Sequence, residues 1–262
     1  MTEQLASTDL EFRLRHHRDE LTRYGVTVVP DVLSDSEVRN FREVVDALYR
    51  LHDPLVDFQG LNIKGGQPDG QALARGALGV EFNFATCLLT KHSCFWSLID
   101  REPVISLVKS VIGPDCVLSS LNSLEPVQGH GQQSLHRDEG PVGPEGSVTA
   151  NSIWVLDSMD VRNGATRLIP GTHLTAELSD DQDSRLTYFD APAGSVIVMN
   201  AHVLHGASTN HDGRRRRVIH GYFTRRGRKV QTDFEYYASQ ASLERLPASC
   251  RALLPHRRDS AG

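Results

Sequence analysis

The chain lacks three features that would each assign it to a class of protein. Its 262 residues include only four cysteines and no Cys-x-x-Cys pair, which excludes a disulfide-stapled scaffold. No apolar run approaches the roughly 18–20 residues that cross a bilayer, so we expect no membrane association. Positive charge is not in excess either. The net charge of −5 excludes a basic field over the whole protein and argues against nucleic acid as the partner.

What remains is the composition of a globular protein. Hydrophobic residues make up 39% of the chain and charged residues 23%, which is enough apolar material for a packed core. The first 17 residues carry no basic segment followed by an apolar one, so we expect no secretory signal peptide and a cytoplasmic location. We expect a single domain over residues 1–262.

Helical patterns dominate residues 1–114, which we expect to be mainly helical. Apolar residues recur at helical spacing over 9–24 and again over about 91–112. Ser34 and Glu37 form a capping-box pattern, which predicts the start of another helix.

Residues 115–225 change to short runs of β-forming residues separated by turn signals. Many short strands at this spacing indicate a sandwich or barrel, with the earlier helices packed outside it. The sequence therefore predicts a mainly β fold with flanking α-helices. The candidate strands are Val26–Pro30, Val117–Leu124, Gln133–Asp138, Ser147–Leu156, Ala165–Ile169, Ser195–Met199 and Val218–Thr224.

Two segments fall outside these patterns. Residues 58–80 are rich in glycine and polar side chains, and a loop of this length in a compact domain is usually functional or disordered. We predict that it forms a lid on the substrate side, with a mobile insertion as the alternative. Residues 226–262 are predicted to be a C-terminal extension.

Histidine is the residue in unusual supply, with 12 in the chain. His136 and Asp138 stand two positions apart, so on a strand they point to the same face with Cα atoms about 6.6 Å apart. An imidazole and a carboxylate placed in this way can occupy two neighbouring positions on one metal ion. The same pattern also occurs at exposed polar strand ends, so a further ligand is needed.

Two candidates for that ligand, His202 and His205, follow a downstream apolar strand. A second imidazole that converges on His136 and Asp138 completes a set of two histidines and one carboxylate. This set leaves three coordination positions open, as non-haem Fe(II) oxygenases require. Zinc is the chemical alternative, because a zinc enzyme needs only one open position for water.

Four consecutive arginines, Arg214 to Arg217, precede the last candidate strand. Three interpretations are open. The arginines form a solvated turn, or they belong to a basic stripe that binds nucleic acid. In the third, one arginine turns inward and binds a carboxylate through two hydrogen bonds. Strand alternation allows no more than every second arginine to face the core.

Taken in order, these segments resemble the phytanoyl-CoA dioxygenase family. The resemblance rests on His-Arg-Asp at 136–138, Asn163–His173, Ala193–Asn210 and an arginine about ten residues later, with Gly25–Val38 similar to the family's opening strand and helix. Members of this family are Fe(II)- and 2-oxoglutarate-dependent oxygenases. The resemblance implies a double-stranded β-helix core, a cupin-like jelly roll, over residues 115–225, with the iron at one end.

The resemblance also implies the metal ligands, which map onto His136, Asp138 and His205. His205 is preferred to His202 because the family's distal histidine is typically followed by a small residue, here Gly206. The carboxylate of Asp138 favours hydroxylation or a related oxidation, because iron halogenases of this superfamily have Gly or Ala at that position.

The cosubstrate is implied in the same way. The arginine that binds the distal carboxylate of 2-oxoglutarate falls on Arg216, with Arg217 as the alternative, and Thr166 is implied as a second contact. Gln133 and Asn122 are further candidate contacts for the cosubstrate. With O₂ as the oxidant, the resemblance implies release of succinate and CO₂ and oxidation of a C–H bond of a small molecule, most simply a specialised metabolite.

The residues beside the His-Arg-Asp motif depart from the family pattern. Ser134, Leu135 and Arg137 stand where aromatic residues or glutamine are common, and the predicted lid has no counterpart. A cupin-like hydrolase or isomerase with the same metal ligands but without 2-oxoglutarate is one alternative. A non-catalytic jelly-roll module that binds a polyanion through residues 214–217 is the other. The substrate, the type of oxidation and the oligomeric state are left open.

Overall fold

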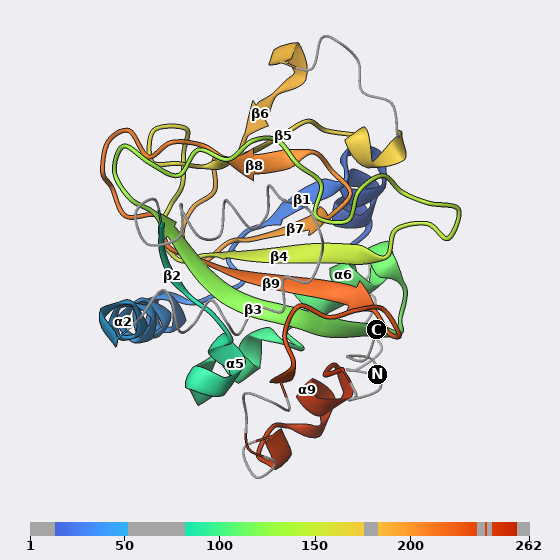
Figure 1. Ribbon diagram of the computed structural model, residues 1–262, viewed down its shortest axis with the longest axis horizontal. Coiled ribbons are helices and arrows are strands. Elements are labelled where there is room, and N and C mark those ends of the chain that lie inside the picture. Colours follow the sequence, from blue (N-terminus) through green and yellow to red (C-terminus); the bar gives the residue numbers. More distant parts are fainter. Residues whose placement is uncertain (1–13, 52–81, 176–182, 235–238, 240–242, 256–262) are drawn as a thin grey trace, which may run out of the picture.

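A computed structural model of the protein contains two antiparallel sheets, which form its centre (Figure 1). The larger sheet has the strand order β1-β7-β4-β9-β3-β2, and the smaller sheet has the order β6-β5-β8. The smaller sheet lies across one face of the larger one. The residues that the structure describes are 14–51, 82–175, 183–234, 239 and 243–255.

The path of the chain between the sheets is that of a jelly roll. From β4 the chain crosses to the smaller sheet, returns at β7, crosses again at β8 and returns at β9. β9 therefore lies between β3 and β4, its neighbours in the larger sheet. The strands are β1 (Val26–Val29), β2 (Phe82–Ala85), β3 (Cys116–Pro126), β4 (Thr149–Val155), β5 (Thr166–Leu168), β6 (Thr187–Tyr188), β7 (Val196–Asn200), β8 (His205–Ala207) and β9 (Val218–Arg225).

The larger sheet is covered on both faces, which explains why all residues of β4 and β7 are buried. Side chains alternate across a pleated sheet, so neighbours along β4 enter different cores. Ile153 and Val155 pack between the two sheets with Ile197 of β7. Trp154 and Val196 point the other way and pack against the helices.

Four helices have bounds within the described residues: α2 (Asp35–Leu51), α5 (Leu88–Lys91), α6 (Val104–Ile112) and α9 (Ala248–Ala252). The capping box that begins α2 is confirmed, because the Ser34 N–H donates to Glu37 Oε2 at 2.9 Å and the Glu37 N–H donates to Ser34 Oγ at 3.3 Å. None of these helices combines the length and hydrophobicity that crossing a bilayer requires. The expected cytoplasmic location stays a prediction.

The helical zone expected over about 91–112 contains a 3₁₀-helix at Ser93–Leu98 and then α6, which begins directly after Pro103, a residue without the N–H that a continuous helix would need. The strand expected at Gln133–Asp138 is wrong. In that segment only His136 forms a β-bridge, with His205.

The part of the chain before residue 115 supplies strands as well as helices. β1 was expected and pairs with β7, whereas β2 was not expected and extends the larger sheet beside β3. Residues 14–24 form the described part of the first helix. The predicted lid at 58–80 lies outside the described residues, and the division into N-terminal part, core and C-terminal extension stays a prediction.

Candidate active site

His136, Asp138 and His205 meet between the sheets, although His205 is far from the other two in the sequence. Each offers one possible ligand atom, and these three atoms all lie within 4.8 Å of one another. His136 Nε2 is 3.5 Å from Asp138 Oδ1, and His205 Nε2 is 3.7 Å from Asp138 Oδ2. The structure therefore brings together the three residues to which the family resemblance assigned the metal.

The backbone joins these residues directly. The N–H of His136 donates to the carbonyl of His205, and the N–H of His205 donates to the carbonyl of His136, both at 2.9 Å. The N–H of Asp138 donates to the carbonyl of Ala201 at 3.1 Å. Because the bonded backbone groups belong to the candidate ligands themselves, the distance between the two imidazoles is fixed by the fold.

Arg137, which departs from the family pattern, holds the same segment in place. Its Nε donates to the carbonyl of His202 at 2.9 Å, and its Nη2 donates to the carbonyls of Thr172 at 3.0 Å and Thr175 at 2.9 Å. A guanidinium that binds three carbonyls ties this irregular segment to the residue-202 turn before β8 and to residues 172–175 after β5. The side chain of Arg137 therefore holds this segment in place, as backbone hydrogen bonds would in a β-strand.

The two imidazoles are oriented so that one nitrogen of each is free to bind a metal. His136 Nδ1 lies 2.9 Å from the carbonyl of Ser134, and His205 Nδ1 lies 3.0 Å from the carbonyl of Val203. A carbonyl can only accept, so Nδ1 carries the hydrogen and Nε2 of each neutral ring keeps its lone pair. Both Nε2 atoms face Asp138. This is the arrangement by which metal-bound histidines are oriented, so the donor set fits a metal ion with nitrogen and oxygen ligands.

The surroundings of Asp138 favour its charged form. Its side chain is 20% exposed, and its Oδ2 accepts a hydrogen bond of 2.7 Å from Asn151 Nδ2. Burial alone would raise the pKa of Asp138, but positive charge on the imidazoles of His205 and His136, when they are protonated, outweighs burial and holds the pKa well below its usual range. Burial lowers the pKa of His205. A charged carboxylate beside a neutral imidazole is what metal binding requires.

His202 takes no part in this cluster. Its ring is 2% exposed, its Nδ1 donates to the carbonyl of Gly140 at 2.8 Å, and its Nε2 accepts from the N–H of Val148 at 3.3 Å. Both ring nitrogens are thus used in holding the backbone. The preference for His205 over His202 as a metal ligand stays a prediction.

A cavity of about 160 Å³ opens beside the three residues. It is smaller than the roughly 300–1,000 Å³ of sites for drug-sized ligands, so it suits a small molecule. Gln133 lines it, and Gln133 Oε1 accepts from the N–H of Ala207 at 2.9 Å. Asn122 is not among the lining residues, and its Oδ1 accepts from the N–H of Cys87 at 3.1 Å. The lining residues are Phe82, Leu124, Gln133, His136, Asp138, Ile153, Thr166, His205, Gly206, Ala207, Arg216, Val218 and His220.

Arg216 reaches this cavity as a buried cation. Its side chain is 3% exposed, its Nη2 donates to Thr166 Oγ1 at 2.9 Å, and its Nε has no hydrogen-bond partner. No carboxylate in the described part of the chain forms an ion pair with it. Burial lowers the pKa of Arg216 to about 10, which still leaves it charged at neutral pH. Arg217, the alternative, is engaged by Asp157 instead.

Sequence reasoning missed His220 as a residue of this site. His220 lies on β9 and lines the cavity, and its imidazole makes no hydrogen bond to any residue that the structure describes. Burial lowers its pKa to about 4, so the ring is neutral at neutral pH. Alternation along the strand could have found it, because residues 216, 218 and 220 share one face.

Substitution of His202 and His205 one at a time distinguishes a metal ligand from a residue that only holds the backbone. In the His205→Ala protein we expect affinity for Fe(II) to fall by about 100-fold or more, since loss of a ligand exceeds the effect of losing an outer partner. In the His202→Ala protein we expect nearly normal Fe(II) affinity but a lower melting temperature, because two buried backbone groups lose their partner. Anaerobic calorimetry and thermal unfolding measure the two effects. Equal loss of Fe(II) affinity in both proteins would contradict the assignment.

Known proteins with a similar chain support the fold. The uncharacterized protein Rv1501 of Mycobacterium tuberculosis is 26% identical over 252 residues, which cover 90% of this chain and 85% of that protein. Dioxygenase af480 of Aspergillus fumigatus is 23% identical over 255 residues, covering 94% and 78%. The structure of SnoN, a non-heme α-ketoglutarate-dependent epimerase from nogalamycin biosynthesis, matches with a TM-score of 0.63 at 16% identity, over 82% of this chain and 84% of SnoN. The expected jelly-roll fold is confirmed.

The family itself is settled by a match over most of the chain. The family model described as phytanoyl-CoA dioxygenase matches residues 21–218. This range contains the metal-ligand candidates, Thr166 and Arg216, and it extends from the first helix to the start of β9. The chain belongs to the phytanoyl-CoA dioxygenase family of Fe(II)- and 2-oxoglutarate-dependent oxygenases.

Proposed function

We propose that the protein oxidises a C–H bond of a small molecule, most simply by hydroxylation. In that reaction substrate, O₂ and 2-oxoglutarate give the hydroxylated product, succinate and CO₂, which balances both atoms of O₂. The observation that carries the proposal is Arg216, a buried guanidinium without a protein carboxylate, in the same small cavity as the metal-ligand candidates.

In this proposal His136, Asp138 and His205 hold Fe(II). When bound, the iron supplies O₂ activation and the oxidising power that follows decarboxylation of 2-oxoglutarate. The protein contributes orientation, because the carbonyls behind the two imidazoles and Asn151 behind the carboxylate keep the ligand atoms directed at one point. Asp138 also occupies the position that a halide would need, which favours oxygen transfer.

At the other end of the cavity, Arg216 binds the distal carboxylate of 2-oxoglutarate. Thr166 Oγ1 accepts the Nη2 hydrogen of Arg216 and is placed to share the carboxylate through its own hydroxyl. Leaving a buried guanidinium unpaired costs several kcal/mol. Pairing it with the carboxylate of a bound dicarboxylate removes that cost and so favours binding. We propose His220 and Gln133 as further polar contacts for the bound cosubstrate.

The remaining wall of the cavity is apolar and restricts water. Phe82, Leu124, Ile153 and Val218 line the cavity together with the metal-ligand candidates and Arg216. Exclusion of water strengthens the ion pair between Arg216 and a carboxylate and protects reactive species from side reactions.

The substrate is proposed by class only. SnoN was solved in a complex with Fe³⁺, α-ketoglutarate and nogalamycin RO, and it shares the fold of this chain at 15% identity. By analogy we propose a small molecule, such as a specialised metabolite. A hydrolase or isomerase that works without 2-oxoglutarate would give no account of the unpaired charge on Arg216, so this alternative is not favoured.

Uncoupled turnover tests the metal assignment without a known substrate. With Fe(II), O₂ and 2-oxoglutarate we expect the wild-type protein to release succinate. In the Asp138→Ala and His205→Ala proteins we expect release to fall to the level of a protein-free control, because each loses a ligand atom. If neither substitution reduced succinate release, the assignment of these residues as ligands would be wrong.

A second substitution tests the cosubstrate end of the cavity. Arg216→Gln removes the charge that faces the distal carboxylate, and we expect the KM for 2-oxoglutarate to rise about 30-fold or more. Arg214→Gln makes the same chemical change at an exposed arginine that pairs with Asp160 and Asp212, so its KM should stay near the wild-type value. Steady-state succinate assays measure both. An unchanged KM in Arg216→Gln would show that the distal carboxylate binds elsewhere.

A further inference from the structure

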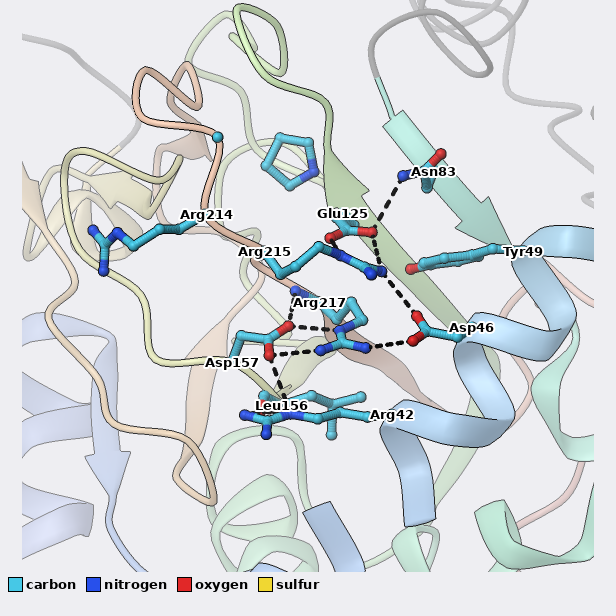
Figure 2. Close-up of polar contacts among 12 residues, drawn as sticks. Arg42, Asp46, Tyr49, Asn83, Glu125, Leu156, Asp157, Arg214, Arg215 and Arg217 are labelled. Carbon is cyan, nitrogen blue, oxygen red and sulfur yellow. Dashed lines mark hydrogen bonds and ion pairs between the residues drawn. The ribbon is translucent and has the colours of Figure 1, made fainter. Parts of the chain in front are cut away.

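The two arginines that flank Arg216 in the chain, Arg215 and Arg217, are anchored by a network of ion pairs (Figure 2). Asp157, which follows β4, accepts three hydrogen bonds from Arg217. The Arg217 N–H and Nε donate to Asp157 Oδ2 at 2.9 and 2.7 Å, and Nη2 donates to Oδ1 at 2.8 Å. Both the backbone and the side chain of residue 217 are therefore held by the end of β4.

One carboxylate links the arginines on either side of Arg216. Asp46 Oδ1 accepts from Arg215 Nη2 and Asp46 Oδ2 accepts from Arg217 Nη1, each at 2.8 Å (Figure 2). Arg215 also binds the buried carboxylate of Glu125 through Nε and Nη2. The side chains of residues 215 and 217 are thus directed to the same side of the chain, toward helix α2.

The network begins on one side of helix α2. Arg42, Asp46 and Tyr49 stand at spacings of four and three residues, so they share a face of the helix. Arg42 Nε and Nη2 donate to the carbonyl of Leu156 at 2.9 and 2.6 Å, and the Tyr49 hydroxyl lies 2.7 Å from Ser123 Oγ. The helix is therefore bonded to the strand ends that surround the arginine segment.

This arrangement has two consequences for Arg216. Asp46 holds Arg215 and Arg217 on the side of α2, whereas Arg216, which lies between them in the chain, lines the cavity. In addition, the nearby carboxylates of Asp46, Glu125 and Asp157 are already bound by the other arginines. A buried guanidinium without a partner would otherwise turn toward such a carboxylate, since an unpaired buried charge is costly.

We propose that Asp46, Asp157 and Arg217 are positioning residues for 2-oxoglutarate binding. They keep Arg216 directed into the cavity and prevent it from pairing with a carboxylate of the protein. The inference rests on the proposed function, in which Arg216 binds the distal carboxylate of the cosubstrate.

The test compares dissociation constants for 2-oxoglutarate, measured by anaerobic calorimetry on the Fe(II)-loaded full chain. We expect Asp46→Asn and Arg217→Gln to raise the constant about tenfold, with the Fe(II) dissociation constant unchanged. Arg217→Lys retains a charge for both carboxylates and should recover part of the loss. Glu43→Gln, an exposed change on the same helix, is the matched control and should bind like wild type. Succinate assays should show a higher KM for 2-oxoglutarate and a kcat close to wild type.

A double substitution separates positioning from general destabilisation. In the Arg216→Gln background, Asp46→Asn should cause no further loss of 2-oxoglutarate affinity, because its effect passes through Arg216. An equal loss with and without Arg216 would overturn the inference, and so would binding by Asp46→Asn and Arg217→Gln that matches Glu43→Gln. If Arg216→Gln alone left the affinity unchanged, the proposed function would fail instead.

Discussion

A buried guanidinium without a protein carboxylate is the feature on which the rest of the account depends. Arg216 sits 3% exposed, with Thr166 as its hydrogen-bond partner, in a cavity that the metal-ligand candidates also line. The free energy cost of such an unpaired charge is several kcal/mol. The site is therefore prepared for an anionic ligand before that ligand arrives.

The metal-ligand candidates are also held in position before any ligand binds. The mutual backbone hydrogen bonds of His136 and His205 set the spacing of two imidazoles, and a carbonyl behind each ring sets which nitrogen is free. The side-chain amide of Asn151 donates to Asp138 and favours its charged form. Donor atoms arranged in this way lose little freedom when a metal binds, which favours affinity.

The sequence predicted most strands because β-forming runs between turn residues are local signals, as in Val218–Thr224 against the observed β9. It predicted the metal-ligand candidates through ordered motifs. It did not predict that Arg217 would be buried as well as Arg216, because the carboxylates that bury Arg217, Asp46 and Asp157, are far away in the chain. His220 was missed because it belongs to none of the motifs, although alternation from Val218 along β9 places it on the cavity face.

Anaerobic absorption spectroscopy tests the central claim most directly. The account predicts that addition of 2-oxoglutarate to the Fe(II)-loaded protein produces a visible charge-transfer band that saturates at one equivalent. The band should be absent when either Fe(II) or 2-oxoglutarate is left out. A protein that binds Fe(II) but gives no band at saturating 2-oxoglutarate would contradict the claim that metal and cosubstrate meet between Asp138 and Arg216.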